Sequence, residues 1–198
     1  MHLYLVRHGE TKLNKQGRFQ GHIDVPLNEK GKQQAIKLGN YFKNIPIDNI
    51  YTSDLKRAIQ TAVQISKHHH VPLETEESIR ERSYGEWEGI SVREVSKQVP
   101  NMKSILQTGG KFGVEKEADL QKRLAQFLNQ YVLTEQNKTI ILVSHAGLIC
   151  SCVNFLTENK IDVPVSSLTH TGVTHFTRIN NREWKMVSLN ESSHLKVI

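Results

Sequence analysis

The amino-acid sequence predicts an α/β fold, a sandwich built around a mostly parallel central sheet. Strand-like and helix-like segments alternate along most of the chain, which is the pattern of repeated β-α units. The strongest strand candidate, TIILVS at residues 139–144, is apolar on both faces, as strands buried in a parallel sheet are. The length of 198 residues suits one core, so we expect residues 1–198 to form a single domain.

The first half of the chain is expected to supply three strands and two helices. The strands are LYLV (3–6), IDNIYTS (47–53) and VPLET (71–75). Helices are expected at 28–44 and 54–67, because apolar residues recur there every three or four positions. The inward-facing residues are Ala35, Leu38 and Phe42 in the first helix, and Ala58, Ala62 and Ile65 in the second. Either Ser53 or Asp54 is expected as the N-cap of the second helix.

The second half begins with an irregular stretch, residues 79–114, rich in glycine and charge, with a short helix expected around VREVSKQ (92–98). A clear amphipathic helix follows at 116–134. Its apolar face consists of Leu120, Leu124, Phe127, Leu128 and Tyr131. After the strand at 139–144, the remaining elements are a helix at 146–158 and two strands, 173–179 and 183–189, around the turn NNRE.

Composition places the chain among ordinary globular proteins. Hydrophobic residues make up 37% and charged residues 23%, which is too apolar for disorder. No apolar run approaches the roughly 18 residues of a membrane span, and the run in MHLYLVRHGE is too short for a signal peptide. We therefore expect a cytoplasmic protein without a membrane partner. Cys150 and Cys152 stand two apart in a predicted helix and point in different directions, so we expect reduced thiols.

The formal charge of +6 favours anionic partners such as nucleic acid, membrane surfaces or small phosphates. The basic residues are spread along the chain, and aromatic residues, at 7%, do not interleave with them as a stacking motif. The sequence therefore shows no nucleic-acid-binding motif, and no nucleic-acid partner is expected.

Polar side chains follow three of the predicted strands. Arg7 and His8 follow 3–6, Arg57 lies one turn beyond 47–53, and His145 follows 139–144. Ligands of parallel sheets bind beyond the carboxyl ends of the strands. Taken singly, each residue has an ordinary structural reading. Together, two arginines and two histidines buried at one end of a core would be costly without an anion, so the sequence predicts a phosphate site.

Four motifs carry a resemblance to a known family: LVRHGET, SDLKRAIQTA, ERSYGEWEG and VSHAGL. In this order and spacing they resemble the histidine phosphatase superfamily, also called the phosphoglycerate mutase-like family. The resemblance runs from Leu3 to the C-terminal NESSHL and covers essentially the whole chain. It implies the phosphoglycerate mutase-like fold, a three-layer α/β/α sandwich, in agreement with the pattern of strands and helices.

The resemblance implies a role for each matching residue. His8 resembles the nucleophile that takes the phosphoryl group onto a ring nitrogen. Arg7, Arg57 and His145 resemble the clamp on the phosphoryl oxygens. Glu81 resembles the general acid that protonates the leaving oxygen and then activates water. Its spacing to Tyr84 and Gly85 selects Glu81 over the neighbouring carboxylates, which are Glu74, Glu76 and Glu77.

Further residues match positions around the phosphate. These are Asn14, Gln20, Gly21 and, at the start of the helix after His145, Ala146. ERSYG also keeps Arg82 and Tyr84, as mutases and fructose-bisphosphatase relatives do. Arg82 is expected either to contact a second anionic group of the substrate or to pair at the surface with Glu86 or Glu88. The family's usual GGES segment is altered to GGKFGVEKEADL.

The favoured function is a metal-independent phosphomonoesterase acting on a small phosphorylated metabolite, without a cofactor. His68, His69 and His70 are expected to form a solvated helix end rather than a metal site. A cofactor-dependent phosphoglycerate mutase is the alternative, although the chain lacks the long mutase insertion after ERSYG and the YDxPPP pattern. A non-enzymatic phosphate-ligand sensor is the third reading. The protein is expected to be a monomer or a homodimer, and the sequence does not name the substrate.

Overall fold

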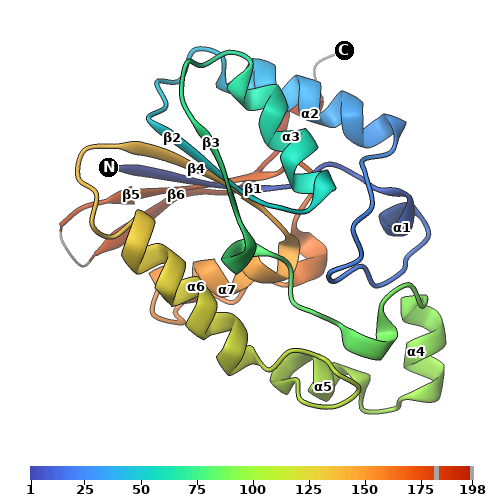
Figure 1. Ribbon diagram of the computed structural model, residues 1–198. Helices are drawn as coiled ribbons and strands as arrows, with labels where there is room; N and C mark the ends of the chain where they lie inside the picture. The colour runs from blue at the N-terminus through green and yellow to red at the C-terminus, as the bar shows by residue number, and fades with distance from the viewer. Residues whose placement is uncertain (181–182, 197–198) are drawn as a thin grey trace.

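The computed structural model describes residues 1–180 and 183–196. Its sheet has six strands in the order β3-β2-β4-β1-β5-β6 (Figure 1). The strands are β1 (His2–Arg7), β2 (Asn49–Ser53), β3 (Leu73–Glu76), β4 (Thr139–Ser144), β5 (Val173–Arg178) and β6 (Trp184–Glu191). The first four strands are parallel, and β5 pairs antiparallel with both β1 and β6. The predicted mostly parallel sheet is confirmed.

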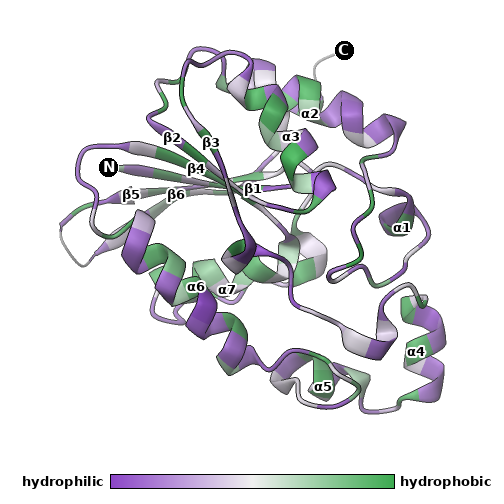
Figure 2. Ribbon diagram, viewed as in Figure 1, coloured by the Kyte–Doolittle hydropathy of each residue, from purple (hydrophilic) through white to green (hydrophobic). Residues whose placement is uncertain are grey.

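Helices cover both faces of the sheet (Figure 1). α2 (Glu29–Phe42) and α3 (Lys56–Ser66) lie on one face, whereas α6 (Glu117–Tyr131) and α7 (Ala146–Leu156) lie on the other. Strand β4 alternates between the layers: Ile141 and Val143 join the cluster of α2 and α3, while Ile140 and Leu142 join that of α6 and α7. α7 is largely hydrophobic, whereas α2 and α6 mix hydrophobic and hydrophilic residues (Figure 2). This is the expected three-layer sandwich.

The remaining elements are short. They are α1 (Lys12–Lys15), α4 (Val92–Gln98), α5 (Met102–Thr108) and the 3₁₀ turns η1 (Glu77–Ile79), η2 (Gly85–Trp87), η3 (Val165–Ser167) and η4 (Ser193–Leu195). The short helix expected at 92–98 is confirmed as α4, but α5 was not predicted. The expected turn NNRE includes residues 181 and 182, which lie outside the described residues.

The expected N-cap of α3 is wrong. The capping residue is Leu55, whose side chain makes no capping hydrogen bond. The chain bends between β2 and α3, where the Leu55 backbone N–H donates to Ser53 Oγ at 3.3 Å. The helix therefore begins two residues later than the sequence predicts, with Arg57 in its first turn.

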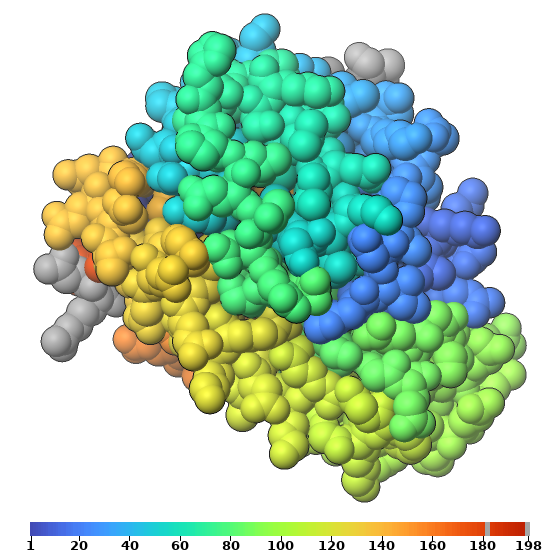
Figure 3. Space-filling model, in the orientation of Figure 1, coloured from blue at the N-terminus to red at the C-terminus, as the bar shows by residue number. Residues whose placement is uncertain are grey.

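Helices α4 and α5 form a small lobe with its own apolar cluster. Phe19, Trp87, Val95, Ile105 and Val114 are buried together there. The lobe is tied to the N-terminal segment, since the Phe19 N–H donates to the Ile90 carbonyl at 3.0 Å. In the space-filling view, the lobe lies against the blue N-terminal segment (Figure 3). It therefore forms a wall beside the segment that follows β1.

Helix α2 packs closely on the loop that follows β1. Its N-cap, Asn28, accepts a hydrogen bond from the Gly31 N–H at 2.8 Å. A Cβ atom on Gly31 would lie 2.1 Å from the Glu10 carbonyl oxygen. Only glycine allows this approach, which fixes the loop at Gly9 and Glu10 against the helix.

Two further findings concern the chain as a whole. Among the residues that the structure describes, no helix is long and apolar enough to cross a membrane. Cys150 and Cys152 are buried free thiols, as expected.

Candidate active site

His8 follows β1 and is buried. Its Nδ1 lies 2.7 Å from the Gly9 carbonyl oxygen, which can only accept, so Nδ1 carries the proton. Burial, and then the charges of Arg57 and Arg7, hold the pKa of His8 well below its usual value. The imidazole is therefore neutral, and its lone pair is on Nε2.

His145 follows β4 at the N-cap of α7, facing His8. The two ring centroids are 5.1 Å apart. His145 Nδ1 accepts from Arg57 Nε at 3.2 Å, which leaves the proton on Nε2. Burial and the Arg57 charge lower the pKa of His145 well below its usual value. Its Nε2–H is buried without a hydrogen-bond partner among the described residues, a donor that awaits an acceptor.

Arg57 is fully buried in the first turn of α3. Its two terminal nitrogens donate to the carbonyls of Ile23 and Gly21, both at 2.8 Å. Burial lowers the pKa of Arg57 to about 10, so the guanidinium is charged at neutral pH. Gly21, which has φ +50°, thus touches the site through its carbonyl, and the loop around it fixes the direction of the guanidinium.

Arg7 ends β1 beside these groups. One terminal nitrogen donates to the Leu168 carbonyl, and the other lies 3.1 Å from His170 Nε2. Its Nε–H is buried and, within the described residues, unpartnered. Arg7 thus offers a second donor that only an added acceptor can satisfy.

His170 is a site residue that sequence reasoning missed. Its ring centroid lies 6.1 Å from that of His8. Because Arg7 donates to Nε2, the His170 proton is on Nδ1. Burial and the Arg7 charge lower the pKa of His170 to about 4. The residue follows no motif, and its position before β5 is the only sequence signal that could have drawn attention to it.

Glu81 is held at the N-terminus of α7. Its two carboxylate oxygens accept backbone hydrogen bonds from Gly147 at 3.1 Å, Leu148 at 3.2 Å and Arg82 at 2.9 Å. The carbonyl of Glu81 accepts from Arg123 Nη2 at 3.0 Å and lies 2.9 Å from His22 Nε2. The helix N-terminus favours a carboxylate at this place, and the contacts fix the residue at both ends.

Asn14 and Gln20 present amide groups beside the N-terminus of α1. The Asn14 Oδ1 accepts from the Thr11 N–H at 3.1 Å, and the Gln20 Oε1 accepts from Thr11 Oγ1 at 2.8 Å. Since the amide oxygens accept from Thr11, each amide nitrogen remains as a donor that can form a hydrogen bond to a phosphate oxygen.

Arg82 differs from the expectation of a surface pair. It is buried and pairs with the Glu117 carboxylate of α6, not with Glu86 or Glu88. It also donates to the Leu106 carbonyl. Its Nε–H is buried without a partner among the described residues, so the expected contact with a second anionic group stays a prediction.

A cavity of about 410 Å³ adjoins the site. Tyr84 lines it, with its ring 4.9 Å from that of Phe19. The first turn of α7, which begins at the buried Ala146, contributes Gly147 to the wall. Gly147 also donates to Glu81, so the cavity adjoins the residues that hold the Glu81 carboxylate.

The histidine run at 68–70 lies away from these residues, after the end of α3 at Ser66. His68 and His70 are exposed as expected, but His69 is half-buried. Within residues 1–180 and 183–196, no group of three or more His, Cys, Asp or Glu side chains is placed to hold a metal ion.

The geometry defines a class of site. Two neutral histidines, two arginines and a carboxylate gather at the carboxyl edge of a parallel sheet. Two buried N–H groups, Arg7 Nε and His145 Nε2, have no partner among the described residues. Such a set of groups suits phosphoryl-transfer chemistry. The sequence profile of the histidine phosphatase superfamily (branch 1) matches residues 3–192. The chain belongs to this superfamily.

Individual relatives and solved structures are similar to the chain over nearly its whole length. An uncharacterized phosphatase, PhoE, of Bacillus subtilis is 31% identical over 96% of this chain and 95% of its own. The structure of the YhfR protein of Bacillus stearothermophilus superposes with a TM-score of 0.87, at 28% identity, covering 98% of both chains. A phosphoserine phosphatase from Entamoeba histolytica, solved with 3-phosphoglyceric acid, gives a TM-score of 0.81 at 32% identity, again over 98% of both chains.

Proposed function

We propose that this protein is a phosphomonoesterase that hydrolyses a small phosphorylated metabolite through a phosphohistidine on His8. One observation carries the proposal: the hydrogen bond to Gly9 fixes the neutral tautomer of His8 with the Nε2 lone pair free. A neutral imidazole of this kind attacks phosphorus directly. The family relatives named as phosphatases support the same class of reaction.

In the first step, His8 Nε2 forms a bond to phosphorus as the bond from phosphorus to the ester oxygen breaks. Glu81 takes up a proton from solvent when the anionic phosphate binds beside it, and it then gives that proton to the departing oxygen, so the product leaves as an alcohol. Negative charge on the phosphoryl oxygens is met by Arg7, Arg57 and the Nε2–H of His145.

In the second step, water replaces the alcohol. Glu81 takes a proton from the water as its oxygen attacks phosphorus, and the bond between phosphorus and His8 breaks. Phosphate leaves, and His8 returns to its neutral form. Asn14, Gln20 and the Ala146 end of α7 add donors around the phosphoryl group in both steps. Apart from the substrate and water, every group in this scheme is a side chain or backbone atom of the chain, so no step is routed through a metal.

The pairing of Arg82 with Glu117 weakens the mutase alternative, which the retention of Arg82 and Tyr84 favoured. A sensor on the same fold would need no fixed nucleophile and no carboxylate held by three N–H groups. We therefore propose that the phosphoryl group is transferred to water. We also propose that residues 1–198 form the single domain that catalyses this reaction.

The test measures phosphate release from phosphorylated metabolites without added metal, with and without a chelator. Wild type should release phosphate, and an acid-labile phosphoryl group should be found on His8 by mass spectrometry after rapid quenching. His8→Ala should abolish turnover while inorganic phosphate still binds in calorimetry. Turnover retained in His8→Ala would contradict the covalent mechanism, and interconversion of 2- and 3-phosphoglycerate without release would indicate a mutase.

A further inference from the structure

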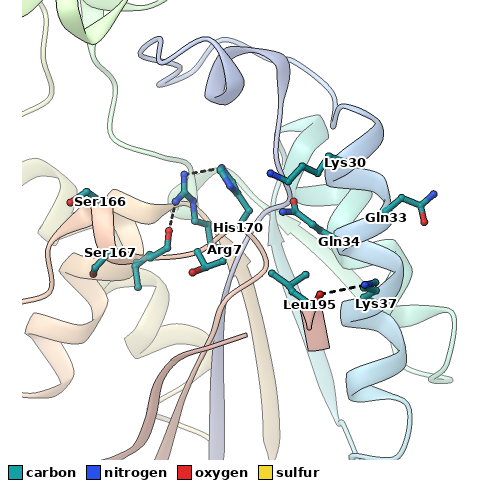
Figure 4. A pocket seen from close by; sticks show the side chains of 11 residues that line it. Arg7, Lys30, Gln33, Gln34, Lys37, Ser166, Ser167, His170 and Leu195 are labelled. Atoms are coloured by element: carbon teal, nitrogen blue, oxygen red, sulfur yellow. Dashed lines mark hydrogen bonds between the residues drawn. The ribbon is translucent and has the colours of Figure 1, made fainter. Parts of the chain in front are cut away.

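One short loop holds the side chain of Arg7. The two terminal nitrogens contact the Leu168 carbonyl and His170 Nε2, and both partners lie in residues 167–171, the loop before β5 (Figure 4). A guanidinium is planar and rigid, so contacts at both terminal nitrogens fix its plane and the direction of its Nε–H. That N–H is buried and has no partner among the described residues. The position of the loop therefore decides where Arg7 offers this donor.

The loop is held in turn by Asn190, near the end of β6. The Asn190 Oδ1 accepts from the Thr169 N–H at 2.8 Å. Its Nδ2 group donates to the Ser167 carbonyl at 2.8 Å and to Thr169 Oγ1 at 3.2 Å. Three hydrogen bonds of one amide thus join the loop on both sides of Leu168, the residue whose carbonyl accepts from Arg7.

The backbone around Asn190 fits this role. Asn190 has φ +52°, a left-handed conformation that asparagine adopts more readily than most residues other than glycine. A Cβ atom on Gly172, directly after the loop, would lie 2.1 Å from the Asn190 Oδ1. The amide can therefore approach the loop only because residue 172 has no side chain.

The last residue of the loop, Thr171, is strained. It has φ +60°, which is unfavourable for a β-branched side chain. Its N–H donates to the Arg7 carbonyl at 3.0 Å, and its hydroxyl donates to the His170 carbonyl at 2.7 Å. The hydroxyl also accepts from His194 Nε2 at 3.1 Å. Strained backbone persists only where surrounding contacts hold it, so loss of these contacts should let the loop and the Arg7 side chain move.

Asn190 and His194 both belong to the C-terminal NESSHL, residues 190–195, which has no part in the two chemical steps. We propose that Asn190 is a positioning residue for phosphate recognition. Its amide holds the loop at 167–171, and the loop holds the Arg7 guanidinium so that the Nε–H is left for a phosphoryl oxygen. The inference rests on the proposed function, because it takes Arg7 as part of the clamp on the phosphoryl group.

A double-mutant cycle on phosphate binding tests this sequence of contacts. Calorimetry measures the affinity of inorganic phosphate for wild type, Asn190→Gly, Arg7→Ala and the double variant. Glycine keeps the left-handed backbone at residue 190 and removes only the amide. Asn190→Gly should weaken phosphate binding about tenfold, the change expected when one charge-assisted hydrogen bond is lost. In the Arg7→Ala background the same substitution should change the affinity by less than about twofold, because its effect passes through Arg7.

Asp48→Ala is the matched control. The Asp48 Oδ2 accepts from the Thr139 N–H at 2.7 Å, so this side chain also holds the backbone of another segment, but at the amino end of β4. The control should leave the phosphate affinity unchanged. Equal weakening by Asn190→Gly in the wild-type and Arg7→Ala backgrounds would assign the effect to a general loss of structure and overturn the positioning role. Unchanged affinity in folded Asn190→Gly would overturn it as well.

Asn190→Asp is a milder second variant, in case the glycine variant does not fold. Aspartate keeps the acceptor for the Thr169 N–H and loses the donor to the Ser167 carbonyl. It should therefore weaken phosphate binding less than glycine does, with the same dependence on Arg7. A loss that is independent of Arg7 would contradict the proposal in this variant too.

Hydrolysis of p-nitrophenyl phosphate by wild type tests the proposed function separately. Its absence, with the coupling between Asn190 and Arg7 intact in phosphate binding, would reject the phosphatase and keep the positioning role. Hydrolysis without that coupling would keep the phosphatase and reject the positioning role. Failure of wild type to bind phosphate would overturn the clamp, and the positioning role with it.

Discussion

At the scale of the residue, the site depends on which nitrogen of each histidine carries the proton. Gly9 fixes the proton of His8 on Nδ1, and Arg57 fixes that of His145 on Nε2. The proposed nucleophile, His8, and the donor that faces it, His145, therefore have complementary tautomers before any substrate binds. Because burial and the neighbouring arginines lower the pKa of both rings, neither one becomes a cation at neutral pH.

The sequence could predict these residues because each belongs to a short motif directly after a strand. It could not predict His170, which pairs with Arg7 across 163 positions of chain, nor the pairing of Arg82 with Glu117. Both depend on how loops return to the site. A motif identifies a residue's neighbours in the chain, but loop geometry decides its neighbours in space.

Glu81 carries the first prediction at this scale. Glu81→Ala should lower kcat/KM for alkyl phosphates by about 10² to 10⁴, the usual contribution of a general acid. Aryl phosphates with good leaving groups should lose much less, because their oxygen departs without a proton. Glu77→Ala is the control, since Glu77 is an exposed neighbour paired with Arg80. Equal losses for alkyl and aryl phosphates would remove Glu81 from the acid role.

At the scale of the element, three parallel strands explain why distant residues meet. Arg7 at the end of β1 is paired with Ser144 at the end of β4, so His8 and His145 leave the sheet at the same level. β2 runs beside β4 and delivers Arg57 one turn later. The rule that ligands bind beyond the carboxyl ends of parallel strands therefore suffices to place these groups together. α5 escaped prediction because its seven residues show too little periodicity.

Helix α6 supplies a brace for the segment that carries Glu81. Arg123 Nη1 donates to the carbonyls of Ser78 and Arg80, both at 2.8 Å, and Nη2 donates to that of Glu81 at 3.0 Å. Glu115 holds the guanidinium in place through a hydrogen bond of 2.8 Å to Nε. The proposed general acid is therefore fixed by a helix that lies outside the proposed phosphate site.

We expect Arg123→Ala to reproduce the pattern of a Glu81 variant in weaker form. Alkyl phosphates should lose about tenfold in kcat/KM, on the order of one charge-assisted hydrogen bond, and aryl phosphates less. Arg123→Lys should restore part of the loss. Arg178→Ala is the control, because Arg178 also donates to two loop carbonyls, those of Leu133 and Glu135, but far from the site. A ratio of alkyl to aryl activity that is the same in wild type and Arg123→Ala would contradict the brace.

At the scale of the whole molecule, the fold buries several histidines in their neutral form. Burial lowers the pKa of His170 and of His175 to about 4, and it holds those of His8 and His145 well below the usual value. In the unfolded chain a histidine titrates near 6.5. Between these values the unfolded state binds more protons than the native state, so the free energy of unfolding rises with pH in this window.

The last prediction concerns this rise of the free energy of unfolding with pH. The free energy of unfolding, measured by urea titration, should be highest above about pH 6.5 and should fall as the pH drops towards 4. Each neutral histidine contributes at most about 1.4 kcal/mol per pH unit to that slope. His175 tests the origin of the effect, because it stacks on Tyr4 at 4.1 Å beside His2 and lies outside the phosphate site. His175→Gln removes one such group, so its slope between about pH 5 and 6.5 should be shallower than that of wild type. Parallel slopes would show that His175 ionises alike in both states and would assign the loss to other groups.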